Sequence, residues 1–253
     1  MTAVLRTSNL CKSFGSFNVT QNFNLSLARG ARHALIGPNG AGKTTLINQL
    51  TGILRPTSGS IWLNDEEITH LAPYERVRRG LSRTFQINTL FPNLTPLEAV
   101  TSAICERERD NLSLLQRRFF PLSQRRAEID EAYQLLDQFK LGRDCLRETH
   151  GLAYGKQRLL EIALALAVRP KVLLLDEPAA GVPEGESDDL FEVLRDLPKD
   201  VTILLIEHDM SLVFRFAQSM TVMVGGAELV SGMPAEIAQD PRVREVYLGK
   251  GHV

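Results

Sequence analysis

The sequence predicts an α/β protein whose centre is a parallel sheet covered by helices on both faces. Its 253 residues, 43% of them hydrophobic, can bury a large core. Short apolar runs alternate along the chain with segments whose apolar residues recur at helical spacing, which is typical of a parallel sheet. Strands are expected at Ala31–Ile36, Val172–Leu175 and Val201–Ile206, and helices at Lys43–Leu54, Gln157–Val168 and Leu190–Leu197.

An antiparallel subdomain is expected at the N-terminus. Residues 4–35 alternate between apolar and polar side chains in the manner of strands. Within them, Val19–Leu27 places apolar residues at every second position before a turn at Arg29-Gly30. This pattern predicts an antiparallel β subdomain that precedes the parallel sheet.

The sequence changes character between about Asn88 and Gly151, where it is charged, helical in pattern and lacks an apolar strand run. We therefore expect an inserted α-helical subdomain at residues 88–151, within a core formed by 1–87 and 152–253. A basic cluster in this segment could bind nucleic acid, but the acidic residues interleaved with it favour a solvated helix face. The cluster comprises Arg117, Arg118, Arg125 and Arg126.

Composition narrows the function classes. With 29 basic and 30 acidic side chains, the formal charge is −1, so no overall field favours nucleic acid or an anionic membrane. No apolar stretch approaches the roughly 20 residues of a membrane-spanning helix, and the N-terminus lacks a signal-peptide pattern. Three widely spaced cysteines, Cys11, Cys105 and Cys145, predict neither disulfides nor a zinc site. A cytoplasmic protein without a nucleic-acid partner is expected.

A phosphate-binding loop is expected between the first parallel strand and its helix. Glycines let the backbone wrap around phosphate, whose charge the N–H groups and the helix N-terminus stabilise. Lys43 should neutralise β/γ oxygens and Thr44 should ligate Mg²⁺; Thr45 follows them in the predicted site. A glycine-rich turn without a ligand would not explain this lysine and hydroxyl. The residues that match GxxxxGK[ST] are Gly37, Pro38, Asn39, Gly40, Ala41, Gly42, Lys43 and Thr44.

Two adjacent carboxylates follow the second parallel strand. Asp176 and Glu177 end the run VLLLDE, at the edge where open α/β sheets bind their ligands. Asp176 can serve the metal, and Glu177 can orient and polarise an attacking water. Carboxylates at a strand end also occur as plain capping residues. Combined with the phosphate loop, however, they predict a P-loop NTPase core that hydrolyses ATP with Mg²⁺.

At this point the sequence resembles the ABC ATPase family across essentially its whole length. The segment Leu152–Arg158, shortly before the Asp176 strand, stands where that family carries its signature. The resemblance implies a second ABC ATPase as partner, identical or related, whose nucleotide this segment caps. The cap would comprise Ala153, Tyr154, Gly155 and Lys156. The common form of the signature is LSGGQ, so Ala153 lacks the usual hydroxyl.

Other residues acquire roles through the same resemblance. Gln86, in the string RTFQ, resembles the Q-loop glutamine that contacts Mg²⁺. His208, in IEHDM, resembles the switch histidine that contacts the γ-phosphate. Phe14 resembles the aromatic residue that stacks on adenine, with Phe17 as the competing candidate. Pro183 stands where the family often has an aspartate, so that carboxylate is absent here.

The resemblance narrows to importer ATPases for branched-chain (hydrophobic) amino acids, whose relatives include subunits for urea and amides. It rests on EPAAGV at 177–182, on IEHDM and on the C-terminal segment from Gly232 to Gly249. It implies a peripheral subunit on the cytoplasmic face of the inner membrane. Its partners would be two transmembrane permease subunits and, indirectly, a solute-binding protein. The alternatives are a soluble ABC ATPase acting on nucleic acid or ribosomes, and a nucleotide sensor with little turnover.

Overall fold

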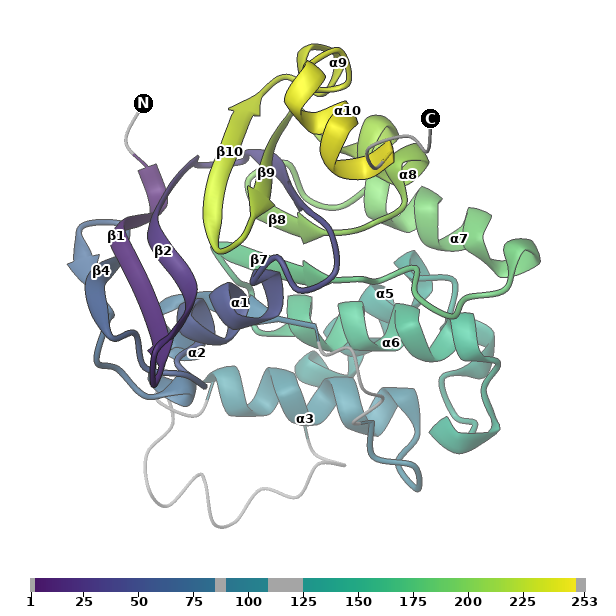
Figure 1. Ribbon diagram of the computed structural model, residues 1–253. Helices are drawn as coiled ribbons and strands as arrows, with labels where there is room; N and C mark the ends of the chain where they lie inside the picture. Colours follow the sequence, from purple (N-terminus) through teal and green to yellow (C-terminus); the bar gives the residue numbers. More distant parts are fainter. Residues whose placement is uncertain (1–2, 85–89, 109–124, 249–253) are drawn as a thin grey trace. The chain divides into compact units, whose positions relative to one another are not determined.

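The computed structural model describes residues 3–84, 90–108 and 125–248 (Figure 1). The chain forms two compact units, each assembled from separate segments. The first consists of Met1–Arg83, Lys171–Glu177 and Pro198–Val253. The second consists of Thr84–Pro170 and Pro178–Leu197.

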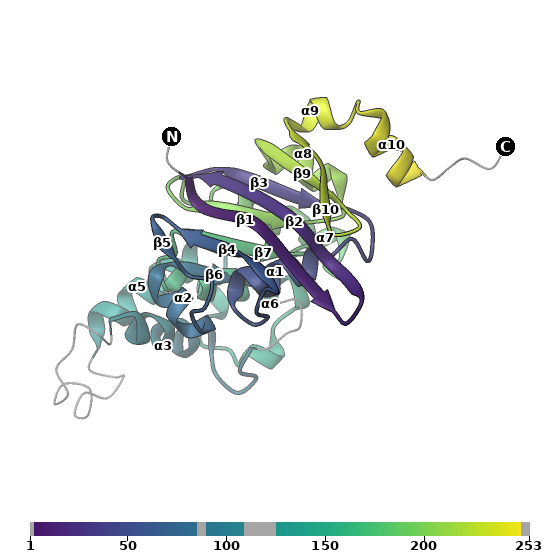
Figure 2. The ribbon, with the colours of Figure 1, turned by 60° about the vertical axis from the view of Figure 1, so that its left-hand side comes forward.

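The first unit contains a four-stranded antiparallel sheet in the order β2-β1-β4-β5. Figure 2 shows β1 and β2 as a long hairpin, as the alternation in this segment predicts. The remaining two strands were not expected from the sequence, because β4 begins with Ser58-Gly59-Ser60 and β5 is only two residues long. The strands are β1 (Ala3–Phe14), β2 (Phe17–Ala28), β4 (Ser58–Leu63) and β5 (Glu66–Glu67).

The same unit contains a six-stranded sheet in the order β10-β9-β3-β8-β7-β6. Its strands pair in parallel except for β10, which is antiparallel to β9. The predicted parallel sheet is therefore confirmed, with additional strands at both edges. The strands are β3 (Arg32–Ile36), β6 (Leu81–Arg83), β7 (Val172–Asp176), β8 (Thr202–Ile206), β9 (Ser219–Val224) and β10 (Ala227–Gly232).

Helices α1 (Lys43–Thr51) and α2 (Pro73–Arg79) complete one side of this unit. Helix α1 was expected to reach Leu54, but it ends at Thr51 because Gly52 adopts a left-handed cap with φ of 81°. The opposite side carries α8 (Met210–Phe216), α9 (Pro234–Ile237) and α10 (Pro241–Leu248), coloured green to yellow in Figure 1.

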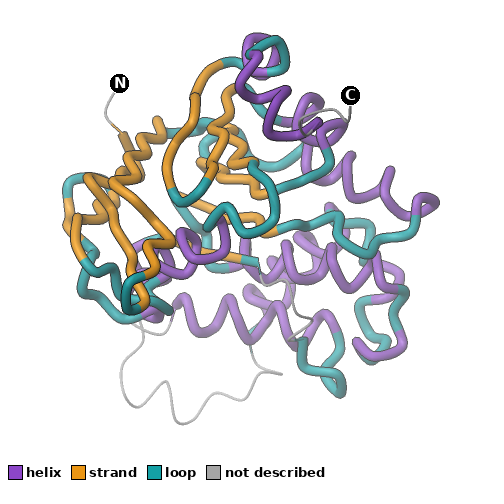
Figure 3. Tube along the Cα trace, viewed as in Figure 1, coloured by secondary structure: helices purple, strands orange, loops and turns teal. Residues whose placement is uncertain are grey.

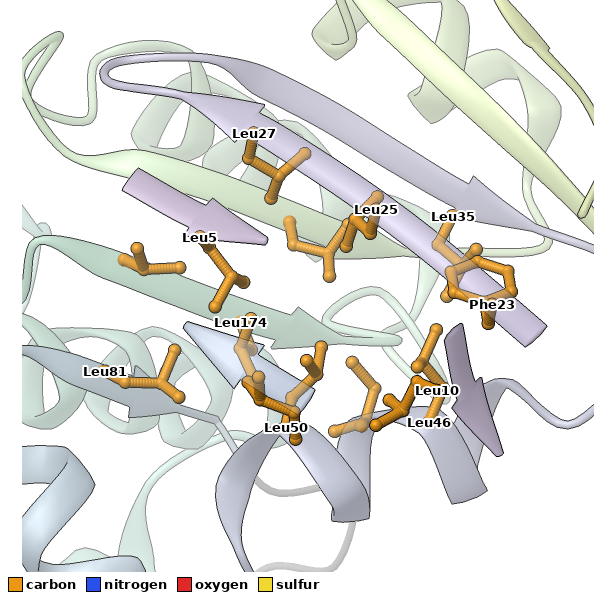
Figure 4. Close-up of a cluster of buried hydrophobic side chains, with 14 of the residues drawn as sticks. Leu5, Leu10, Phe23, Leu25, Leu27, Leu35, Leu46, Leu50, Leu81 and Leu174 are labelled. Carbon is orange, nitrogen blue, oxygen red and sulfur yellow. The ribbon is translucent and has the colours of Figure 1, made fainter. Parts of the chain in front are cut away.

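Hydrophobic side chains hold these layers together. Leu46, Ile47 and Leu50 of α1 are buried in a cluster shared by both sheets. Alternation along β3 sends Leu35 into this cluster, while Ala34 and Ile36 enter a second cluster beneath the C-terminal helices. Figure 4 labels Leu5, Leu10, Phe23, Leu25, Leu27, Leu35, Leu46, Leu50, Leu81 and Leu174 of the first cluster.

The described residues of the second unit form helices and loops, drawn in purple and teal in Figure 3. Arg107 joins two of the helices, since its guanidinium donates to both carboxylate oxygens of Glu131 at 2.8 Å. Of the basic cluster, Arg117 and Arg118 lie outside the described residues. The helices are α3 (Pro96–Glu108), α5 (Arg126–Gln138), α6 (Tyr154–Ala167) and α7 (Glu184–Arg195), with short 3₁₀ turns at Gly142–Asp144 and Thr149–Gly151.

Candidate active site

The carboxyl edge of the six-stranded sheet brings the predicted phosphate loop and carboxylates to one place. Ile206, the last residue of β8, is in register with Leu35 on one side and with Asp176 on the other. The segments that follow β3, β7 and β8 therefore leave the sheet at the same level. Lys43, Glu177 and His208 follow these strand ends.

The phosphate loop, residues 37–44, is fixed by close packing of its backbone. A β-carbon on Gly42 would lie 2.6 Å from the carbonyl oxygen of Val19, and this glycine has φ of 103°. A β-carbon on Gly37 would collide with the carbonyl of Met223. The Gly226 N–H donates to the Ala41 carbonyl at 2.9 Å. Glycine is therefore required where the loop packs on β2 and β9, independently of any ligand.

Lys43 folds back over this loop. Its ammonium donates to the carbonyl oxygens of Gly37 at 2.6 Å and Pro38 at 3.1 Å. Burial lowers the pKa of Lys43, and the charges of Glu177 and Asp176 oppose that shift. The loop therefore holds a cation over the backbone that the motif predicts will surround phosphate.

The hydroxyl groups predicted for the site lie in the first turn of α1. The side chain of Thr44 is exposed and that of Thr45 is half-buried. Asn39 and Gly40, at the outer part of the loop, are also exposed, while Pro38 is half-buried. Solvent therefore reaches the outer part of the loop and the first hydroxyl.

Asp176 is buried at the end of β7 and paired with a cation that sequence reasoning missed. Its Oδ2 accepts a hydrogen bond from Arg83 Nη2 at 2.6 Å. Burial raises the pKa of Asp176, and the Arg83 guanidinium opposes this shift. In the sequence Arg83 is only the first residue of the string RTFQ, and its pairing with Asp176 follows from its position at the end of β6, beside β7.

Glu177 adopts a left-handed backbone conformation, with φ of 47°, directly after β7. Its N–H donates to the Ile206 carbonyl at 2.9 Å, which extends the pairing with β8 by one residue. A left-handed glutamate is uncommon, and such residues often mark functional sites. The chain turns at Glu177, whose half-buried side chain stands at the strand end.

His208 follows β8 as predicted, but its ring is 64% exposed. Its Nδ1 lies 3.8 Å from Oε2 of the buried Glu207. The Glu207 carboxylate accepts from the N–H groups of His208 and Asp209, at 3.1 and 3.4 Å. Asp209 in turn caps α8 by accepting from the N–H groups of Ser211 and Leu212. The IEHDM string thus contains two structural carboxylates that the sequence did not reveal.

Phe14 lies at the tip of the β1–β2 hairpin, paired in register with Phe17. Both rings are exposed, by 52% and 70%. Lys12 Nζ stands 5.0 Å from the centroid of the Phe14 ring. An exposed ring can stack on a planar ligand, and Phe14 is distinguished from Phe17 by this neighbouring cation.

The predicted signature residues begin α6 in the second unit. Ala153 is the N-cap, and the Gly155 N–H donates to Glu186 Oε2 at 2.7 Å. The Tyr154 hydroxyl accepts from Arg158 at 2.6 Å and donates to the Ala180 carbonyl at 3.3 Å.

Lys156 Nζ is bound to Asp144 at 2.6 Å. The first turn of α6 is thus already bound to two carboxylates of the second unit, Glu186 at the Gly155 N–H and Asp144 at Lys156. Gln86, predicted for both nucleotide and metal, lies outside the described residues.

The oxygen donors suit Mg²⁺. A hydroxyl from Thr44 and a carboxylate from Asp176 are hard ligands of the type that Mg²⁺ binds together with substrate phosphates. Across the described ranges there is no group of three or more histidine, cysteine or acidic side chains that could hold a metal alone. The donor set therefore fits an ion that arrives with a nucleotide.

Comparison with known proteins decides the family. Residues 20–180 match the family described as ABC transporter, and residues 229–253 match one described as branched-chain amino acid ATP-binding cassette transporter. The chain belongs to the ABC transporter ATP-binding family. The resemblance on which the sequence predictions drew is thereby confirmed, together with the fold class.

The curated relatives of this ABC protein are similar over almost their entire length. BraF of Pseudomonas aeruginosa, a high-affinity branched-chain amino acid transport ATP-binding protein, is 39% identical over 252 residues, or 98% of each chain. LivG of Escherichia coli K12, described in the same terms, is 39% identical over 251 residues, again 98% of each. A probable LivG from Methanocaldococcus jannaschii is 34% identical over 253 residues, or 98% of each chain.

Solved structures agree with the fold of this ABC protein. A nucleotide-free ATP-binding cassette from an ABC transporter has a TM-score of 0.84 and 32% identity, covering 98% of this chain and 100% of the other. The ADP conformation of such a cassette gives the same score and identity, with coverage of 99% and 100%. Among the described residues, no helix is long and apolar enough to cross a membrane.

Proposed function

We propose that this chain is the ATP-hydrolysing motor subunit of an ABC importer for branched-chain amino acids. The observation that carries the proposal is the 39% identity to BraF and LivG over 98% of the chain. The phosphate loop and the Asp176-Glu177 pair at one sheet edge support it. Urea and amides are the related solutes that this subunit could serve.

The residues divide the work as follows. The loop amides and Lys43 bind the phosphates of ATP, once Lys43 exchanges the Gly37 and Pro38 carbonyls for phosphate oxygens. Glu177 orients and polarises the attacking water, and His208 turns from solvent to contact the γ-phosphate. Phe14 stacks on adenine. Thr44, Asp176 and Gln86 would hold Mg²⁺, which would neutralise charge on the nucleotide phosphates.

The assembly requires partners. A second ABC ATPase, either identical or related, would present Ala153, Tyr154, Gly155 and Lys156 to the nucleotide bound by the first. Two transmembrane permease subunits would anchor the pair at the cytoplasmic face of the inner membrane, and a solute-binding protein would deliver cargo. The helical subdomain at residues 88–151 would transmit closure to the permeases.

Steady ATP turnover by the full chain tests the enzymatic part of this proposal. Lys43→Ala should abolish turnover through loss of phosphate binding. Glu177→Gln should still bind ATP but reduce turnover by at least about 100-fold, a factor typical of losing a group that assists proton transfer. Wild-type turnover in Glu177→Gln would remove Glu177 from this role.

A nucleotide sensor with little turnover is the second candidate, and Ala153 and Pro183 favour it. ATP binding by the wild-type chain without turnover, also in the presence of its permeases, would select the sensor. Purification from gently solubilised membranes tests the importer. Two multi-spanning subunits and a second ATPase should accompany the chain, whereas purely ribosomal or soluble partners would contradict the proposal.

A further inference from the structure

Arg83 and Asp176 form a buried ion pair at the carboxyl edge of the six-stranded sheet. The side chains are 8% and 1% exposed, and Arg83 Nη2 lies 2.6 Å from Asp176 Oδ2. They come from adjacent strands, since Arg83 of β6 is in register with Leu174 of β7. Each of these charges offsets part of the cost of removing the other from water.

Arg83 also contacts the helix that follows the phosphate loop. Its Nη1 donates to Asn48 Oδ1 at 2.7 Å, and Asn48 belongs to α1. A guanidinium is planar and rigid, so its two ends cannot adjust independently. One side chain therefore ties β7, which ends in the predicted metal carboxylate, to α1, which begins with Lys43 and Thr44.

We propose that Arg83 is a positioning residue for the MgATP site, fixing the Asp176 carboxylate relative to the Thr44 hydroxyl. The inference rests on the proposed function, because it concerns how that site receives its metal. A fixed carboxylate loses little freedom when the ion arrives with the nucleotide, and this preorganisation strengthens binding.

Two other roles for Arg83 predict different results. A purely structural ion pair would change the stability of the fold but not the effect of Mg²⁺ on nucleotide affinity. A cation that competes with Mg²⁺ for Asp176 would have to leave, so its removal would increase the effect of Mg²⁺. One measured quantity distinguishes the three roles: the gain in nucleotide affinity that Mg²⁺ provides.

The experiment titrates ADP into the full chain by calorimetry, once with MgCl₂ and once with EDTA. Arg83→Met should reduce the gain in affinity from Mg²⁺ by about tenfold, a difference of about 1.4 kcal/mol. Its affinity in EDTA should stay within about twofold of wild type, because the loop amides and Lys43 are unchanged. Arg83→Lys should be intermediate, since a point charge pairs with Asp176 but cannot also hold Asn48 in a fork.

Arg79→Met is the matched control. It breaks an arginine–carboxylate pair of the same length, 2.6 Å to Glu66, in the same unit, but at the end of α2 that precedes β6. The gain from Mg²⁺ should be unchanged in this variant. Arg83→Gln replaces Arg83→Met if the latter does not fold.

An unchanged or increased gain in a folded Arg83 variant would overturn this inference and leave the proposed function intact. By contrast, failure of the wild-type chain to bind ADP with Mg²⁺ would contradict the proposed function itself and this inference with it.

Discussion

His33, the second residue of β3, is a buried base whose ring lies between two hydroxyls. Its Nδ1 is 2.8 Å from Ser219 Oγ and its Nε2 is 2.9 Å from Thr221 Oγ1. Thr221 continues the chain of contacts to Ser231 at 2.9 Å. Burial lowers the pKa of His33 to about 4, so the ring is neutral in the folded protein at neutral pH.

This residue makes stability depend on pH. Because the folded pKa of about 4 lies below the unfolded value of 6.5, the unfolded chain binds the proton first as pH falls. Its contribution is complete above pH 6.5 and declines between that pH and about 4. Between pH 7.5 and 5 the free energy of unfolding should fall by about 2 kcal/mol on account of His33. Urea titrations of wild type and His33→Asn at both pH values test this, and equal pH dependence would refute it.

Arg76 is a buried cation whose hydrogen bonds all go to carbonyls. It donates to Gln49 and Leu50 at 2.7 Å, Thr69 at 2.8 Å and Leu71 at 3.1 Å. Two of these carbonyls belong to the last turn of α1, where a cation also complements the helix dipole. Burial lowers the pKa of Arg76 to about 10, which still leaves it charged at neutral pH.

Removing this side chain should be costly. Arg76→Met leaves buried carbonyls without donors, and the expected loss of unfolding free energy is about 3 kcal/mol or more. Thermal unfolding compared with Arg78→Met, an exposed neighbour on α2, provides the measurement. Equal melting temperatures in the two variants would show that the carbonyls find other donors.

At the scale of elements, the periodicity of apolar residues was sufficient to predict the strand–loop–helix unit around the phosphate loop, as well as β7 and β8. It was insufficient to predict β9, because two polar residues, Ser219 and Thr221, interrupt the apolar run. Both contact the ring of His33. β6 is too short for any pattern. The ends of helices also depended on local conformation, as Gly52 shows for α1.

The candidate site likewise contains residues that could be predicted from the sequence and residues that could not. The phosphate loop and the Asp176-Glu177 pair could be predicted because each motif consists of residues that are adjacent in the sequence. Arg83 could not, because its role depends on the pairing of strands far apart in the sequence. The exposed ring of His208 could not either, since sequence does not determine the orientation of a solvated side chain.

Helix α6 provides a prediction at this scale. Its Gly155 amide is held by the Glu186 carboxylate from α7, an anion at a helix N-terminus. Glu186→Gln should lower the unfolding free energy by about 1 kcal/mol through loss of this charge. The control is Glu192→Gln, also on α7. The Glu192 carboxylate pairs with Lys140 in solvent and should contribute less to the unfolding free energy. Equal stability of the two variants would contradict the cap.

At the scale of the whole chain, the central position of β3 determines which truncations are tolerated. It lies between β8 and β9, both from the last quarter of the sequence. A chain that stops at residue 200 lacks both neighbours and should fail to fold cooperatively or bind ATP. A chain that stops at Gly232 keeps every strand and should retain a cooperative transition at lower stability. Circular dichroism during thermal unfolding tests both truncations, and cooperative unfolding of the shorter chain would refute the prediction.

The same order of strands has a consequence for biosynthesis. The ribosome releases the phosphate loop early, but the strands that flank β3 emerge only some 170 residues later, from Thr202 onwards. At about 5–20 residues per second, synthesis of this interval takes roughly 10 to 30 seconds, during which the apolar edges of β3 remain unpaired. The nascent chain therefore needs protection from aggregation throughout most of its own synthesis, and nucleotide can stabilise it only when translation is almost complete.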